Sequence, residues 1–332
     1  MITINEIAKK AGVAKSTVSR YLNEGSVSEK TKKKIAKIIE ETDYQPNLYA
    51  QSLKAKSSKM IGVVIPRLNS ASTNDALTGI DSEAKKNGYE PVFLNSNLKI
   101  DNDIKNIQIL NKQKVEGIIF FARELTNELI EVIQESKVPI ILVGQTLKGS
   151  YSVTHKDYEA GYKMGEYLRQ MGHQKVLFMG VSEKDKAVGV NRKQGFNDAF
   201  EKEEGESYFL ETSFSKRKTY QLVIEELPNY FDQEITAIVC ATDNIAIAVA
   251  KGLTDLGKSI PNDFSLTGFG GYDITSYFNP SITTVRYPYQ DIGKTAVKHL
   301  LKQVKNKNIT AKNVELVNEL IIQASVKKIN KE

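Results

Sequence analysis

Short hydroxyl and cationic side chains near the N-terminus have the types and spacing needed to bind nucleic acid. They occupy residues 15–22, with the sequence KSTVSRYL. Arginine and lysine donate hydrogen bonds to guanine edges and phosphates, and serine and threonine hydroxyls bond to either. In a helix, Val18, Tyr21 and Leu22 would form the apolar side. We therefore expect the polar residues to face the major groove of DNA: Lys15, Ser16, Thr17, Ser19 and Arg20.

Motifs of common enzyme classes do not accompany this pattern. The sequence has no GxSxG nucleophile motif, and GFGG at 268–271 lacks the GxGxxG spacing. GLTDLGKS at 252–259 has the spacing of a GxxxxGKS phosphate loop, but it lies at the end of the predicted helix 244–256, whereas a phosphate loop follows a strand. His155, His173 and His299 are too scattered for a metal site. The single cysteine, Cys240, lies in an apolar run typical of a buried side chain. We expect no enzyme activity, no cofactor and no bound metal.

The net charge of +6 is concentrated at the N-terminus. Residues 1–59 contain twelve Lys and Arg against six Asp and Glu, whereas the remaining 34 bases and 34 acids cancel. A basic segment attached to a neutral remainder indicates a polyanionic partner for that segment alone. No apolar run approaches the roughly 20 residues of a membrane span, and the N-terminus lacks the apolar core of a secretory signal. We expect a cytoplasmic protein without membrane contact.

Three predicted helices would position the DNA-facing side chains. Thr3 and Glu6 have the spacing of a capping box. The first helix then carries an apolar stripe of Ile4, Ile7, Ala8 and Ala11, and Gly12 is a natural helix stop. Ser28 is placed to cap a third helix, whose buried face is Ile35, Ile38 and Ile39. Three short helices with a glycine-containing turn predict an all-α helix-turn-helix unit over residues 1–45.

Taken as a whole, TINEIAKKAGVAKSTVSRYLNEGSVS closely resembles the DNA-binding segment of the lactose/galactose-repressor family. The resemblance implies that Lys15, Ser16 and Arg20 read bases, and that Thr17 and Ser19 mostly contact phosphates and anchor the helix. Ala14 stands where the family usually has serine, which removes an N-cap worth about 1 kcal/mol. The DNA contacts expected in this unit are Thr3, Lys15, Ser16, Thr17, Ser19, Arg20 and Asn23.

Residues 46–59 are expected to form a hinge helix and linker. Pro46 and Asn47 signal a helix start, but the predicted helix has only about two turns and would not be stable alone. The segment resembles the family's hinge helix, which orders when two subunits pair on DNA. That resemblance places Leu53 as an apolar wedge in the minor groove. The expected contacts here are Asn47, Ala50, Leu53 and Lys54.

From residue 60 onward, short apolar runs alternate with amphipathic stretches. Candidate strands are 60–65, 91–94, 117–121, 140–143, 176–179, 237–240, 265–269 and 283–286. Candidate helices are 75–87, 104–112, 128–135, 158–170, 192–200, 244–256 and 290–302. Such alternation predicts parallel sheets with helices on both faces, and the units suffice for two doubly wound sheets.

The family resemblance continues through GYKMGEYLRQMGHQKVLFMGV, AIVCATDNIAIAVAKGL and FNPSITTVRYPYQDIGKTA. It implies two lobes of the periplasmic sugar-binding type, with the effector in the cleft between them. Residues 60–332 would then bind effector and dimerise, with one lobe of about 60–158 and 288–317 and another of about 159–287 and 318–332. A homodimer would bind a pseudo-palindromic operator in double-stranded DNA.

Ligands of open α/β sheets bind beyond the carboxyl ends of strands. Arg192 matches the arginine that most family members use to grip sugar hydroxyls. Asp243 has two possible roles, capping its helix or touching ligand, and the sequence does not decide between them. The expected effector contacts are Arg67, Asn69, Ser70, Gln145, Lys186, Gly189, Arg192, Thr242, Asp243 and Gly270.

The charges in the predicted cleft favour an anionic effector. Arg67, Lys184 and Lys186 suit a phosphate or carboxylate better than a neutral sugar, unless the two lysines are simply solvated loop charges. Gly270-Gly271 stands where many relatives place an acid for sugar hydroxyls. PRLNS, MGVSEKDKAVG and VCATDN resemble the trehalose-operon and sucrose-operon repressor branches, which implies a disaccharide or its 6-phosphate.

Two other functions fit parts of these observations. A purine-, amino-acid- or phosphoprotein-responsive regulator of the same family would share the DNA-binding unit, and ligand binding would separate it from a sugar-responsive one. A sugar-binding transport protein fits residues 60–332, but such a protein needs export and has no use for a basic DNA-binding segment. The sequence therefore favours a repressor of a carbohydrate-utilisation operon.

Overall fold

The computed structural model describes residues 2–22, 25–44, 57–306 and 310–330. The chain divides into two compact units, Met1–Ser58 and Lys59–Glu332, which we call the head and the body. Within the described ranges, no helix has both the length and the apolar character needed to cross a membrane.

The described part of the head is a three-helix unit around a small apolar core. The predicted capping box is confirmed: the Thr3 hydroxyl accepts from the Glu6 amide, and the Glu6 carboxylate accepts from the Thr3 amide at 2.7 Å. The predicted cap at Ser28 is wrong, because its hydroxyl lies 2.9 Å from that of Thr31 and bonds no backbone amide of the helix. The helices are α1 Ile4–Ala11, α2 Lys15–Leu22 and α3 Glu29–Thr42, and their buried core is Ile7, Ala8, Ala11, Val18 and Ile35.

The body contains two six-stranded sheets, each covered by helices, and we call the two halves the first and second lobes. The first lobe has the all-parallel strand order β11-β5-β4-β3-β1-β2. Its elements are β1 Met60–Ile65, α5 Ala71–Lys86, β2 Glu90–Asn95, α6 Ile100–Lys112, β3 Ile118–Phe121, α7 Asn127–Gln134, β4 Ile140–Val143, β5 Tyr151–His155, α12 Tyr289–Lys305 and β11 Asn313–Leu316.

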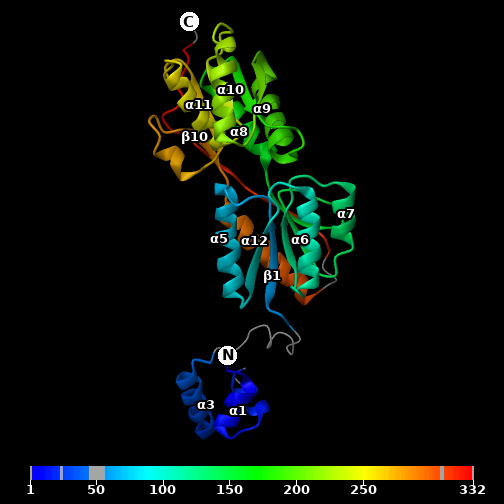
Figure 1. Ribbon diagram of the computed structural model, residues 1–332. Coiled ribbons are helices and arrows are strands. Elements are labelled where there is room, and N and C mark those ends of the chain that lie inside the picture. The colour runs from blue at the N-terminus through cyan, green and yellow to red at the C-terminus, as the bar shows by residue number, and fades with distance from the viewer. Residues whose placement is uncertain (1, 23–24, 45–56, 307–309, 331–332) are drawn as a thin grey trace. The chain divides into compact units, whose positions relative to one another are not determined.

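Alternating side chains of the strands build a separate core on each face of the first lobe's sheet. Ile61, Val63 and Ile65 of β1 pack with α5 and α12, whereas Val64 packs with α6 and α7. Figure 1 shows these two helix pairs on opposite sides of β1. The predicted doubly wound fold is confirmed here, and the carboxyl ends of the strands point towards the second lobe.

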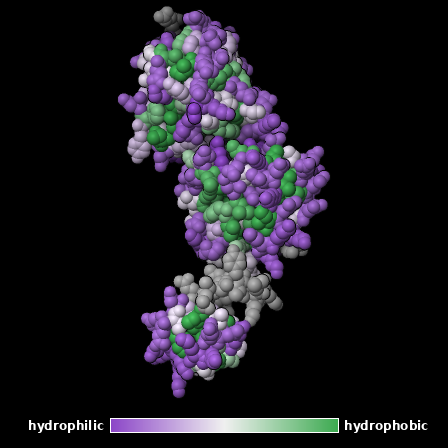
Figure 2. Space-filling model, viewed as in Figure 1, coloured by the Kyte–Doolittle hydropathy of each residue, from purple (hydrophilic) through white to green (hydrophobic). Residues whose placement is uncertain are grey.

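The second lobe repeats this plan with one antiparallel edge. Its strand order is β12-β10-β9-β8-β6-β7, and β12 runs antiparallel to β10. Hydrophilic side chains cover most of the viewed face of the body, with apolar patches between them (Figure 2). The elements are α8 Asp157–Gln170, β6 Lys175–Gly180, α9 Lys193–Phe200, β7 Glu206–Glu211, α10 Lys216–Glu226, β8 Ala237–Cys240, α11 Asp243–Asp255, β9 Ser265–Gly270, β10 Thr283–Arg286 and β12 Glu319–Ile321.

The chain passes between the lobes at three places, after β5, after β10 and after β11. A π-helical turn, Lys186–Arg192, precedes α9 and packs against α8. π-helical turns are rare in proteins, and those that occur often lie at functional sites. The first crossing therefore brings the start of α8 close to the end of this turn.

Gly79 lets α5 and α12 pack at backbone contact, and Gly79→Ala should destabilise the body. An added Cβ would lie 2.0 Å from the Gln290 carbonyl oxygen. Alanine gains about 1 kcal/mol of helix propensity, but overpacking against an immovable backbone costs about 1–3 kcal/mol. We expect a net loss of up to about 2 kcal/mol in the free energy of unfolding by urea. Thr78→Ala, at an exposed neighbouring position, is the control. A stabilised Gly79→Ala variant would contradict the close contact.

Candidate functional site

The exposed side of α2 presents the predicted DNA-facing residues together. Val18 is fully buried in the head core, whereas Lys15, Ser16 and Arg20 are exposed and Thr17 and Ser19 are half-buried. The Thr17 and Val18 amides bond to the Ala14 carbonyl, so the helix begins without a side-chain cap from Ala14. The predicted orientation of α2 is confirmed, and its contact with DNA stays a prediction.

Of the other predicted DNA contacts, only Thr3 lies among the described residues. The hydroxyl of Thr3 is engaged in the capping box, where it also donates to the Glu6 carboxylate at 2.9 Å. Backbone and side-chain hydrogen bonds from Thr3 lower the pKa of Glu6. The remaining predicted contacts lie outside the described residues: Asn23, Asn47, Ala50, Leu53 and Lys54.

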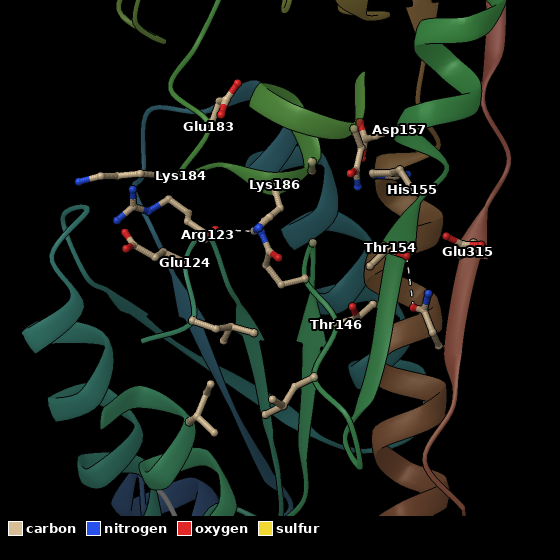
Figure 3. A pocket seen from close by; sticks show the side chains of 18 residues that line it. Arg123, Glu124, Thr146, Thr154, His155, Asp157, Glu183, Lys184, Lys186 and Glu315 are labelled. Carbon is tan, nitrogen blue, oxygen red and sulfur yellow. Dashed lines mark hydrogen bonds between the residues drawn. The ribbon is translucent and has the colours of Figure 1, made fainter. Parts of the chain in front are cut away.

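A cavity of about 790 Å³ lies between the two lobes (Figure 3), within the size range of small-molecule sites. The first lobe lines it with loops after β3 and β4, the end of β5 and part of β11. The second lobe lines it with the start of α8 at Asp157 and with residues that follow β6: Glu183, Lys184, Lys186, Ala187 and Asn191. Because the carboxyl ends of parallel strands meet at one edge of a sheet, this is the expected place for a ligand.

Cations approach the cavity from both lobes. Arg123 comes from the first lobe, and Lys184 and Lys186 come from the second, as Figure 3 shows. The Arg123 guanidinium donates to the Leu98 carbonyl at 2.9 Å, which fixes its direction. One lining acid, Glu183, is paired with Lys193 at 2.7 Å. The cavity lining therefore carries cations from both lobes.

Arg67 joins the lobes beside this cavity and is not among its lining residues. Its guanidinium lies 5.3 Å from the ring centre of Phe214 in the second lobe. Burial lowers the pKa of Arg67, and Tyr272, Arg123 and Asp185 are its electrostatic neighbours. Arg67 thus forms part of the contact between the lobes.

Arg192 is buried behind the cavity. Its side chain is 6% exposed, and its guanidinium bonds to Asp157 and to the Ala241 carbonyl. The rings of Phe269 and Tyr287 lie on it at 5.0 and 4.9 Å. The structure brings Arg192 to the expected region but occupies it with protein partners.

Several other predicted effector contacts serve the fold of the second lobe. Thr242 caps α11 through the Ile245 amide. Asp243 is fully buried and accepts from the Tyr272 amide at 2.9 Å and the Thr284 hydroxyl at 2.6 Å. Burial raises the pKa of Asp243 to about 6. A side chain at Gly270 would meet the Asp243 carboxylate at 2.8 Å. Asp243 is thus a structural acceptor in this structure.

Two of the predicted effector contacts, Gln145 and Lys186, line the cavity. Ser70 caps α5, Asn69 is exposed and Gly189 packs against the Ser182 carbonyl. The sequence prediction omitted Arg123, His155 and Asp157, which also line the cavity. The last two stand at the end of β5 and the start of α8, and β5 was not among the predicted strands.

A three-helix DNA-binding head joined to two α/β lobes around a cavity defines a ligand-controlled transcription regulator. The family described as bacterial regulatory proteins, lacI family, matches residues 3–47, and the periplasmic binding protein-like domain matches residues 166–326. The chain belongs to the lacI family of bacterial regulatory proteins.

Individual relatives match over nearly the whole chain. The sucrose operon repressor of Staphylococcus xylosus is 40% identical, covering 93% of this chain and 96% of that protein. The transcriptional repressor PurR of Vibrio vulnificus (strain CMCP6) is 28% identical, covering 99% and 100%. The structure of the lac repressor dimer bound to operator and the anti-inducer ONPF covers 98% of this chain and 99% of that one, with a TM-score of 0.88 and 23% identity, which shows the shared fold.

Proposed function

We propose that this protein represses a carbohydrate-utilisation operon and is controlled by a sugar or sugar phosphate bound between its lobes. The observation that carries the proposal is the 40% identity, over nearly the whole chain, to a sucrose operon repressor. The polar cavity between the lobes supports it, because a sugar needs many hydrogen-bonding partners. Its action on an operator would take place in the cytoplasm.

The effector we favour is a sucrose- or trehalose-type disaccharide phosphate. Arg123, Lys184 and Lys186 would hold its anionic group through charge-assisted hydrogen bonds. Gln145, whose amide nitrogen already bonds the Arg123 carbonyl at 2.9 Å, would offer its oxygen to a hydroxyl. A ligand that bridges both lobes would favour one lobe arrangement over another, which is the condition for allosteric control of the head.

DNA binding would require two copies of the chain. In this proposal the body dimerises and places two heads over a pseudo-palindrome, while residues 46–59 pair as hinge helices and Leu53 enters the minor groove. On the second lobe, Tyr277 is 84% exposed and Ile274 is 49% exposed. Exposed large apolar side chains of this kind support a protein contact surface.

Calorimetry with sucrose, trehalose, their 6-phosphates and a purine base tests the effector class. We expect a 6-phosphate to bind at least ten times more tightly than its neutral sugar, because charged hydrogen bonds contribute about 1.5–3 kcal/mol. Arg123→Gln should remove most of this preference. Lys148→Gln, an exposed residue outside the cavity lining, is the control. Equal affinity for phosphorylated and neutral sugars would refute the anionic effector, and binding of the purine alone would favour the purine-responsive alternative.

A further inference from the structure

We infer that Gly25 is a positioning residue for operator recognition, because its missing side chain leaves the space that the stem of Arg20 occupies. The inference deepens the proposed function and rests on it, since it takes Arg20 as a base-reading residue of α2. It gives a role in DNA recognition to a residue outside the predicted DNA contacts. What Gly25 sets is the direction in which one arginine leaves the recognition helix.

Gly25 follows α2 and folds back onto the last turn of that helix. Its amide donates to the Arg20 carbonyl at 2.8 Å. A Cβ at position 25 would lie 2.6 Å from Arg20 Cγ, 3.6 Å from Arg20 Cδ and 3.1 Å from the Arg20 carbonyl oxygen. Carbon atoms in ordinary contact are about 3.5–4.0 Å apart. The stem of Arg20 therefore lies against the backbone of Gly25, in space that any other side chain would need.

Backbone conformation does not explain the glycine at position 25. Gly12, which ends α1, has the left-handed φ of 59° that glycine adopts readily, whereas Gly25 does not lie in the left-handed region. The three atoms nearest to a Cβ at position 25 all belong to Arg20. The need for a residue without a side chain therefore comes from the arginine.

Displacing the stem would redirect the guanidinium of Arg20. A long side chain in a helix has two common χ1 wells, so a contact that forces Arg20 out of one well turns it into the other. An arginine that reads a base must align two of its donors with one guanine edge. Arg20 is exposed, whereas Val18 is fully buried and holds α2 to the head core. The arginine can therefore turn while the helix keeps its place.

Fluorescence anisotropy on the full-length protein, with an operator fragment selected by wild type, tests the inference. Gly25→Ala should weaken operator binding at least about fivefold, the lower end of the effect of losing an arginine–base contact. Single base-pair substitutions in the fragment give a sharper readout. The pair whose replacement weakens binding by wild type but not by Arg20→Ala is the pair that Arg20 reads. Gly25→Ala should lose discrimination at that pair and keep it at the others.

A double-mutant cycle separates the side-chain contact from strain in the backbone. Arg20→Ala removes Cγ and Cδ but keeps the carbonyl that Gly25 approaches. Adding Gly25→Ala to Arg20→Ala should therefore change operator affinity less than about twofold. Lys37→Ala, at an exposed position on α3, is the matched background, and Gly25→Ala should keep its full effect there.

Binding to a scrambled fragment reports whether the head remains folded. Wild-type affinity and discrimination in Gly25→Ala would overturn the inference. So would an equal loss with and without the Arg20 side chain, or a loss of binding to the scrambled fragment, because the glycine would then serve the fold of the head. These results leave the proposed function standing. If Arg20→Ala bound the operator as wild type does, the base-reading role of Arg20 would fail together with the inference, and a wild-type protein that selects no operator would overturn the proposed function itself.

Discussion

Arg20→Ala should lower affinity for the operator about 5- to 150-fold, the effect of losing about 1–3 kcal/mol from a base contact by an arginine. Arg20 is exposed on α2, and the same helix buries Val18 in the head core. The helix therefore keeps its place when Arg20 is shortened. Fluorescence anisotropy with an operator fragment selected by the wild-type protein measures the loss, and a scrambled fragment measures how much specificity remains.

The matched control for Arg20 is Lys37→Ala on α3. It removes the same charge from the head, and its side chain is exposed beside Glu41 at 3.7 Å. Because a charge away from the recognition helix contributes mainly non-specific attraction, we expect a change of less than about threefold. Equal losses for the two variants would mean that net charge alone governs binding, and the base-reading role of α2 would then be wrong.

Acidification should destabilise the body between pH 6.5 and 4, and buried histidines are the reason. Burial lowers the pKa of both His155 and His173 to about 4. Between pH 6.5 and 4 the unfolded chain binds protons at these histidines that the native state does not bind. The free energy of unfolding therefore falls as the pH falls. Each lowered histidine pKa corresponds to a loss of about 3 kcal/mol in the free energy of unfolding once the pH has fallen below about 4.

Asp243 opposes this trend. Burial raises the pKa of its carboxyl to about 6. The native state therefore holds a proton that the unfolded chain has released, and this group's contribution to stability falls as pH rises from 4 to 6. The contribution of Asp243 cancels about that of one histidine. Acidification should therefore lower the free energy of unfolding by a net amount on the order of 3 kcal/mol.

Urea unfolding between pH 4.5 and 7 measures the slope of the free energy of unfolding against pH. His173→Gln should flatten it by roughly the effect of one histidine, because glutamine does not titrate and can still bond the Thr236 hydroxyl, which lies 2.8 Å from His173 Nδ1. Asp243→Asn should make the slope steeper. A His173→Gln variant whose stability falls with acid as steeply as that of wild type would show that this histidine is not responsible.

Strong local signals explain what sequence reasoning predicted well. The Thr3–Glu6 capping box, the apolar stripe of α1 and the buried side of α2 all arise within a few residues of each other. The apolar strands 60–65, 140–143 and 237–240 were predicted to the residue for the same reason, since each is buried on both faces and carries no polar interruption. Helix starts were less certain: α5 begins at Ala71, four residues before its predicted start.

Elements with mixed composition were missed. Strand β5, with the sequence YSVTH, has no apolar run, yet it is buried in the structure. The hydroxyls of Ser152 and Thr154 are satisfied by the Asn313 side chain, which is about 160 residues away in sequence. Strand β7 and helix α10 were overlooked as well, because charged residues dilute their periodicity.

The sequence by itself determined the class of protein: a basic head, two α/β lobes and a cleft between strand ends. The basic head follows from composition and the α/β character from local periodicity, whereas the two lobes and their cleft are what the family resemblance implies. Tertiary structure alone decided which groups face the cavity. Asp157 and Arg192 are 35 residues apart, and Tyr287 is 130 residues from Asp157. The crossings between the lobes bring them together, and the resulting bonds tie Arg192 to Asp157, which lines the cavity.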